Sequence, residues 1–193
     1  MLPGIQHTEL LALLASGAIL MAPAAPAAAQ HGDPHTQGGQ FEAVHIEREH
    51  SIELAALPAQ VFPLFEPGGF ALWSVSWKPL LLYPRSGELR AGAVAIMRHA
   101  AHEESQVWFV VDHDPNTGRI RYFNVIPEIE AWEMDITCSD NGQGGTRVTV
   151  AYRVTALSEH ANEMVQDFFD HNFESGVEGW AEKINTYLRD VGK

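Results

Sequence analysis

Hydrophobic and polar residues alternate along much of the central part of this 193-residue chain. In 44–54, every second residue from Val44 onward lies on one face, which is apolar apart from Arg48 and His50. The intervening residues, Glu47 and Glu53 among them, are polar, so the segment is predicted to be a strand with one buried and one solvated face. The same pattern predicts further strands at Ala93–His99, Ser105–His113, Arg119–Ile126, Glu130–Ser139 and Thr146–Thr155.

Short turns separate the predicted strands. Residues 114–118 read DPNTG and residues 140–145 read DNGQGG, and both segments are rich in the residues that form tight turns. Neighbouring strands joined by short loops pair in antiparallel fashion. The pattern therefore predicts an antiparallel meander.

Two short helical pieces are expected after the first strand. The first is Leu57–Phe65, in which Pro58 suits the first position of a helix. Pro63 prevents a longer regular helix, because it lacks a backbone N–H. A second helical or looped piece carries Trp73 and Trp77.

The C-terminal part is expected to form one long helix, from about Ser158 to Leu188. Ser158 suits the N-cap position, and an apolar stripe recurs at helical spacing. Gly176 and Gly179 lie inside this helix, which indicates a close approach to the sheet or to a ligand. Because the sheet must bury its apolar face, and this stripe is the only one long enough to cover it, the order of elements predicts an α+β fold.

The N-terminus has the pattern of a secretion signal. An apolar run, Leu10–Ala22, precedes small residues that fit a cleavage site, so 1–29 is predicted to be a signal peptide of an exported protein. The first nine residues contain no Lys or Arg and do contain Glu9, which leaves an uncleaved anchor or a misassigned start as alternatives. Residues 30–41 are polar and rich in Gly, which predicts a flexible linker before a domain at 42–193.

Charge and cysteine content narrow the possible functions. With 12 Lys and Arg against 25 Asp and Glu, the formal net charge is −13, which disfavours nucleic acid as a partner. Cys138 is the single cysteine, so an internal disulfide is excluded, and its strand position predicts a buried core residue. Glycine-rich nucleotide loops and a G-x-S-x-G elbow are both absent from the sequence, so no cofactor is expected.

The order of elements resembles the START-like superfamily, also called SRPBCC, in its polyketide cyclase-like and lipid-transport branch. The resemblance covers about Val44 to Leu188 and is carried by four segments: LPAQVFPLF (57–65), LWSVSWKP (72–79), VWFVVDHDPNTGRIRYFNVIP (107–127) and RVTVAYRVTALSEHANEM (147–164). It implies a helix-grip fold, in which a curved antiparallel sheet of six to seven strands closes around a long C-terminal helix. It fixes no reaction, because one fold hosts many functions.

Aromatic residues are the main candidates for binding a ligand, because large flat side chains line cavities for greasy molecules. They fall in segments that would face the space between the sheet and the last helix. Trp180 and Phe168 are expected to be core residues instead. The predicted ligand-binding set is Trp73, Trp77, Met97, Trp108, Tyr122, Trp132, Phe169 and Phe173.

Polar residues facing the same space are the candidates for anchoring a ligand or transferring protons: Arg48, His50, Tyr122 and Glu130, with Arg98 as a similar case. The pair His99 and His102 has a spacing close to that of a metal site, but the glutamates follow the second histidine and the two positions point to opposite faces of a strand. We therefore expect no metal site there.

Three functions remain open at this point. The first is binding or carriage of a hydrophobic small molecule or lipid, without a membrane span once the leader is cleaved. The second is a polyketide cyclase or dehydratase-like enzyme that uses the polar cavity residues. The third is an envelope protein-interaction module with a collapsed cavity and an apolar surface patch. The oligomeric state is not indicated by the sequence.

Overall fold

The computed structural model describes residues 41–99 and 105–191. Within these ranges the strands form one antiparallel sheet in the order β1-β7-β6-β5-β4-β3-β2. The strands are β1 (His45–Leu54), β2 (Trp77–Tyr83), β3 (Val94–His99), β4 (Ser105–Asp114), β5 (Arg119–Ile126), β6 (Glu130–Asp140) and β7 (Thr146–Ala156). The helices are α1 (Pro58–Val61), the 3-10 turn η2 (Phe62–Phe65), α2 (Pro67–Trp73), α3 (Glu159–His171) and α4 (Phe173–Val191).

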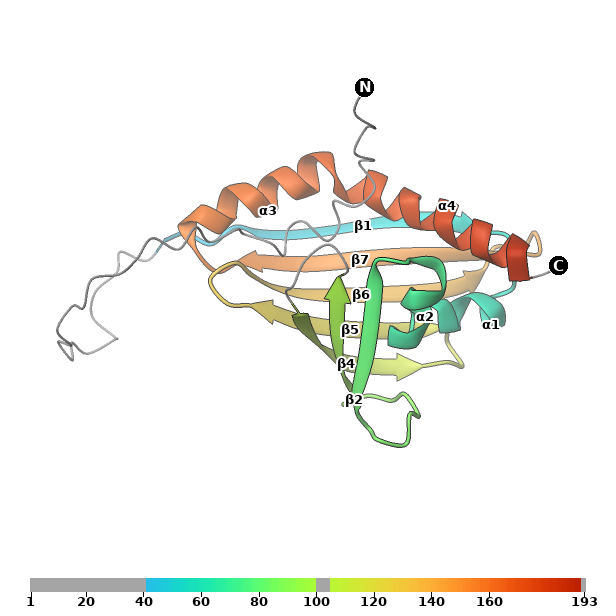
Figure 1. Ribbon diagram of the computed structural model, residues 1–193. Helices are drawn as coiled ribbons and strands as arrows, with labels where there is room; N and C mark the ends of the chain where they lie inside the picture. The colour runs from blue at the N-terminus through green and yellow to red at the C-terminus, as the bar shows by residue number, and fades with distance from the viewer. Residues whose placement is uncertain (1–40, 100–104, 192–193) are drawn as a thin grey trace, which may run out of the picture.

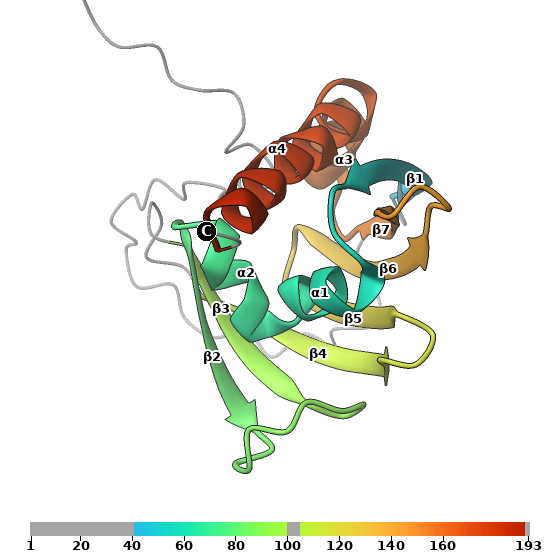
Figure 2. The same ribbon diagram turned by 90° about the vertical axis from the view of Figure 1, so that its right-hand side faces the viewer.

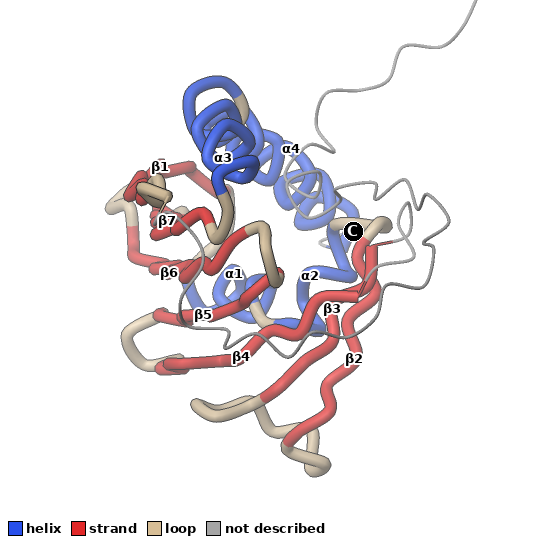
Figure 3. The backbone as a smooth tube through the Cα atoms, turned by 90° about the vertical axis from the view of Figure 1, so that its left-hand side faces the viewer, coloured by secondary structure: helices blue, strands red, loops and turns tan. Residues whose placement is uncertain are grey.

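The sheet curves around the helices. Figure 1 shows α3 and α4 running across the sheet beside β1, and Figures 2 and 3 show α1 and α2 inside the curve of the sheet. The hydrophobic core fills the space between the concave face of the sheet and these helices. This arrangement is the α+β helix-grip fold that the sequence predicts.

Strand alternation predicted the central strands closely, with β5 matching at both ends. It missed β2, which lies at the edge of the sheet. Leu80, Leu81 and Leu82 are consecutive apolar residues, so this segment shows no period of two. Pro79 lacks a backbone N–H and also argued against a strand, but an edge strand tolerates proline because one of its sides has no ladder to complete.

The expected single C-terminal helix is instead two helices that meet at Asn172. The backbone of Asn172 has φ −123° and ψ −22°, which interrupts the helical path between α3 and α4. Figure 1 shows the change of direction at this point. The predicted N-cap is present, since the Ser158 hydroxyl accepts a hydrogen bond from the Ala161 N–H.

Two buried aromatic side chains fix the short helices inside the sheet. The Tyr122 hydroxyl donates to the carbonyl of Phe65 at 2.7 Å, and Trp73 Nε1 donates to the carbonyl of Leu64 at 2.9 Å. Gly69 allows α2 to pack against η2, because a Cβ at this position would lie 2.0 Å from the carbonyl oxygen of Pro63. Together these contacts place Phe70 of α2 at the centre of the aromatic core.

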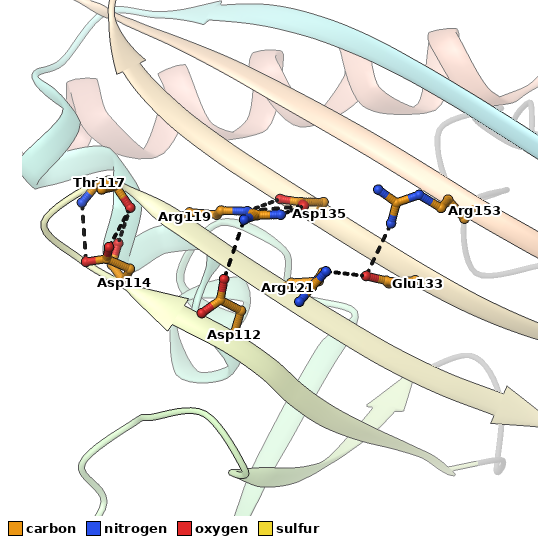
Figure 4. A network of polar contacts seen from close by, with 8 residues as sticks. All are labelled: Asp112, Asp114, Thr117, Arg119, Arg121, Glu133, Asp135 and Arg153. Atoms are coloured by element: carbon orange, nitrogen blue, oxygen red, sulfur yellow. Dashed lines mark hydrogen bonds and ion pairs between the residues drawn. The ribbon is translucent and has the colours of Figure 1, made fainter.

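The convex face of the sheet carries two different surfaces. Arginine and acidic side chains alternate across β4, β5, β6 and β7, and Figure 4 shows this ion-pair network around Arg119 and Glu133. Toward β2 the same face carries exposed apolar side chains, which we call the outer apolar surface: Leu80, Leu82, Val107, Phe109, Val111, Phe123 and Val125.

The predicted signal peptide at 1–29, and the predicted linker apart from Phe41, lie outside the described residues. Within 41–99 and 105–191, none of the helices combines the length and the apolar character needed to span a bilayer.

Candidate functional site

An enclosed pocket lies between the concave face of the sheet and the helices α2, α3 and α4. Its volume is about 40 Å³. Eleven of the described residues line it, of which eight are aromatic and four of those are tryptophans. The lining residues are Phe70, Trp77, Gln106, Trp108, Glu130, Trp132, Tyr152, Val154, Phe168, Phe169 and Trp180.

The alternation of the strands points these side chains inward. In β6, Glu130, Trp132 and Met134 are buried, whereas Ala131 and Glu133 between them face outward. Trp132 pairs with Val154 in the neighbouring strand β7, which brings both into the same wall of the pocket. The helices complete the enclosure with Phe168 and Phe169 from α3 and Trp180 from α4.

Neighbouring rings in the pocket stand nearly perpendicular to one another. The ring centres of Trp108 and Trp132 are 5.0 Å apart with an interplanar angle of 88°. Phe70 meets Trp108 at 82° and Trp180 at 81°. Such edge-to-face contacts are the favoured geometry for aromatic pairs. As a result, the rings that line the pocket lie in several different planes.

Glu130 is the acidic residue of the pocket, and its side chain is almost completely buried, with 4% exposed. None of the residues that the structure describes forms a hydrogen bond or ion pair with its carboxyl group. Burial raises the pKa of Glu130 to about 8, because removing a carboxylate from water disfavours the charged form. At neutral pH the carboxyl group is therefore mainly protonated.

Two other polar groups line the same space. Burial, and then the neighbouring Glu130, raise the pKa of Tyr152 above its usual range, so its hydroxyl stays protonated. Gln106 accepts a hydrogen bond from Trp108 Nε1 at 3.0 Å, which fixes the orientation of that indole. Trp77, Gln106 and Tyr152 are half-buried, and they are the lining residues closest to solvent.

The structure brings together about half of the predicted site residues. Trp77, Trp108, Trp132, Phe169 and Glu130 all line the pocket. The remaining four of the predicted ligand-binding set are buried in the adjoining core and do not line it: Trp73, Met97, Tyr122 and Phe173. The hydrogen bonds of Trp73 and Tyr122 to η2 explain this, since their polar ends are already committed to backbone carbonyls.

Arg48 and His50 lie on the helix-facing side of β1, but β1 is an edge strand and neither residue reaches the pocket. Arg48 is exposed and donates to the backbone carbonyl of Glu47 at 3.1 Å. His50 is half-buried, and its Nε2 lies 2.7 Å from Glu178 Oε1 on α4. Arg98 is exposed on β3, and the side chains of His99 and His102 lie outside the described residues.

Six of the lining residues were not assigned to the site from the sequence. Phe168 and Trp180 were expected to be core, and periodicity alone cannot separate a core position from a pocket wall. Tyr152 and Val154 belong to the alternating pattern of β7, which signalled an inward side chain but nothing more. Phe70 and Gln106 gave no signal, because their positions depend on the packing of α2 and on the pairing of β4.

A second hollow of about 540 Å³ lies between α1 and the turn that joins β4 to β5. It is larger, but among the described residues that line it Phe62 is the one aromatic. Apolar ligands favour concave sites with aromatic walls. The aromatic pocket is therefore the better candidate despite its smaller volume.

Several solved structures share this fold. Norcoclaurine synthase from Thalictrum flavum is 13% identical over 84% of this chain and 98% of its own, with a TM-score of 0.58. Ara h 8.0201 is 13% identical over 76% of this chain and 99% of its own, with a TM-score of 0.56. A protein from Rhizobium leguminosarum is 19% identical over 77% of this chain and 97% of its own, also with a TM-score of 0.56.

No protein-family model and no curated protein matches the sequence. At such low identities the solved structures show the fold alone, and the polyketide cyclase-like branch stays a prediction. Norcoclaurine synthase and Ara h 8 are Bet v 1-like proteins of the START/SRPBCC superfamily, and this chain shares their helix-grip architecture.

Proposed function

We propose that this protein binds a hydrophobic small molecule in the pocket between the sheet and the C-terminal helices. The observation that carries the proposal is the enclosed space walled by eight aromatic rings. Burial of apolar surface contributes about 25 cal/mol per Å², so a ligand that buries roughly 200 Å² would gain about 5 kcal/mol. Glu130, Gln106 and Tyr152 supply the few polar groups that orient a ligand in such a site.

The size of the pocket sets a condition on binding. Its volume of about 40 Å³ accommodates a few atoms, whereas pockets for drug-sized ligands span roughly 300–1,000 Å³. A larger ligand must therefore displace some of the rings. Trp77 and Tyr152 are half-buried, and we expect their side chains to move when the ligand enters.

The test is a fluorescence titration with the neutral apolar dye Nile red on the wild type and two matched variants. Trp132→Leu alters the pocket, and Phe123→Leu alters an aromatic residue of the outer apolar surface, where Phe123 is 39% exposed. We expect Trp132→Leu to weaken dye binding about tenfold, a loss of about 1.4 kcal/mol, and Phe123→Leu to leave it within about twofold. Circular dichroism spectra that match the wild type would serve as the control that both variants are folded.

The opposite result would overturn the proposal. If Phe123→Leu weakens binding and Trp132→Leu does not, the dye binds the outer apolar surface, and the interaction-module hypothesis gains support. Native mass spectrometry of the protein from its own host would then identify a retained ligand or a retained protein partner.

Proton transfer is a second candidate function, favoured by Glu130 alone. A buried carboxyl group with a pKa of about 8 in an enclosed pocket suits a general acid or base at neutral pH. Of the four polar residues proposed from the sequence, Glu130 is the one that lines the pocket. A ligand identified by mass spectrometry that is converted by the wild type and not by Glu130→Gln would establish this function.

A further inference from the structure

The pocket is lined mainly by aromatic side chains, which is typical of sites that bind organic cations. The four tryptophans among its lining residues offer the ring type that attracts cations most strongly, through the negative potential of the ring face. Phe70, Tyr152, Phe168 and Phe169 add four further rings. Because neighbouring rings stand nearly perpendicular, the enclosed space is bordered by aromatic groups in several directions.

Glu130 gives this aromatic pocket an acidic group that has no partner among the residues that the structure describes. Its side chain is 4% exposed and borders the pocket. No Lys, Arg or His is among the described residues that line the pocket, and Tyr152 is the other titratable group there. A carboxyl group buried in this way stays protonated unless a cation pairs with its ionised form.

Glu133, on the outer face of the same strand, shows how the protein treats an acidic residue that it pairs internally. Its carboxylate lies 3.1 Å from Arg121 Nη1 and 3.2 Å from Arg153 Nη1. Glu130 has no such counterpart among the described residues, so within this part of the structure its carboxyl group is available to a cation that enters the pocket. The net charge of −13 also attracts cations and repels anions.

We infer that the pocket binds the ammonium head of a small organic cation, with the aromatic rings around the head and Glu130 as its counter-ion. This inference rests on the proposed function, since it names the ligand class of the same pocket. The small enclosed volume favours a compact head group.

Binding of the cation is linked to the release of a proton. Without ligand the Glu130 carboxyl group holds a proton at neutral pH, and it gives this proton to water when the ammonium group binds. No bond other than the carboxyl O–H changes in this step. The affinity for the cation therefore rises with pH through about 8, where Glu130 is half ionised, and levels off once the carboxyl group is fully ionised above it.

The test compares choline, whose charge does not change with pH, with its neutral carbon analogue 3,3-dimethyl-1-butanol. Calorimetric titrations at pH 6, 7, 8 and 9 use the wild type, Glu130→Gln and the outer-face control Glu133→Gln. We expect choline to bind at least about tenfold more tightly than the alcohol at pH 9. We also expect it to bind about fiftyfold more tightly at pH 8 than at pH 6, because the ionised fraction of Glu130 rises by about that factor. In Glu130→Gln the pH dependence disappears and the preference for choline shrinks to the part that the aromatic rings supply, whereas Glu133→Gln retains both differences in full.

The outcomes separate this inference from the proposed function. Equal binding of choline and the alcohol, or unchanged choline binding in Glu130→Gln, would overturn the inference while Nile red still binds in the pocket. Tighter binding of the alcohol below pH 8 would instead assign Glu130 as a hydrogen-bond donor to a neutral ligand. If neither probe nor Nile red binds, the proposed function itself fails.

Discussion

Glu130 and Glu133 lie three residues apart on β6 and face opposite sides of the sheet. Glu130 points into the aromatic pocket without a counter-ion among the described residues, and its pKa is raised to about 8. Glu133 lies between Arg121 and Arg153 in the network of Figure 4. Its Oε1 is within ion-pair distance of both arginines, although it accepts no hydrogen bond of good geometry, so the contact is mainly electrostatic.

One alternating strand sequence therefore provides two separate chemical environments, one on each face of the sheet. On the outer face, paired charges are screened by water and contribute to solubility and to modest stabilisation. On the inner face, the same residue type is destabilised in its charged form and is available to an incoming ligand.

The pH dependence of stability should depend on Glu130. Its pKa is about 8 in the folded protein and about 4.5 in the unfolded chain, so between these pH values the folded state binds more protons. The free energy of unfolding should therefore fall by roughly 4–5 kcal/mol as pH rises through this window, and then level off. Urea titrations from pH 4.5 to 9 should show this fall in the wild type and in Glu133→Gln, and should lack it in Glu130→Gln.

Shortening a side chain should be far more destabilising on the inner face of β6 than on the outer face. Ile136 is fully buried, so Ile136→Ala should lower the free energy of unfolding by about 2–5 kcal/mol through lost burial and a residual cavity. Thr137 faces outward, and Thr137→Ala should change it by less than about 0.5 kcal/mol. Equal effects in urea unfolding would contradict the assignment of the two faces.

The ion pairs of the outer face should contribute modestly and depend on salt. Removing the charge of Glu133 in Glu133→Gln leaves Arg121 and Arg153 without it, and we expect a loss of about 1 kcal/mol at low salt. In 1 M NaCl the difference from the wild type should shrink by about half or more, because the charges are then screened. A salt-independent loss would point to packing instead of charge.

Replacing His50 should have the smallest effect on stability. Its contact with Glu178 joins the edge strand β1 to α4, but Glu178 is 60% exposed and the pair lies away from the pocket. We expect His50→Gln to lower stability by a few tenths of a kcal/mol and to leave Nile red binding unchanged. A large loss of dye binding would show that the edge of the sheet controls access to the pocket.

The sequence was sufficient where a feature depends on local pattern. Alternation placed Glu130, Trp132 and Met134 on one side of β6, and Ser158 marked the start of α3. The local sequence pattern was insufficient where tertiary packing determines the structure. The interruption at Asn172 has no Pro to signal it, and β2 has no alternation because it is an edge strand with apolar side chains on both faces.

The residues of the pocket could also be predicted only in part from the local sequence pattern. Alternation identified Glu130 as an inward polar residue, but its lack of a partner depends on residues distant in sequence. Tyr122 carried the same inward signal, and its hydroxyl is instead bound to the carbonyl of Phe65, 57 residues away. Contacts between residues so distant in sequence depend on how α2 and η2 pack inside the sheet. A local sequence pattern holds no information about that packing.

The outer apolar surface should make the protein prone to self-association when its net charge is lost. Leu80, Phe109 and Val125 are each 46–47% exposed, and at neutral pH the net charge of −13 keeps molecules carrying these patches apart. Acidification protonates the carboxylates and removes this repulsion, while the apolar area stays the same. Light scattering should therefore show self-association as the pH approaches the isoelectric point, and Phe109→Ser should weaken it, because this change removes exposed apolar area without altering the net charge.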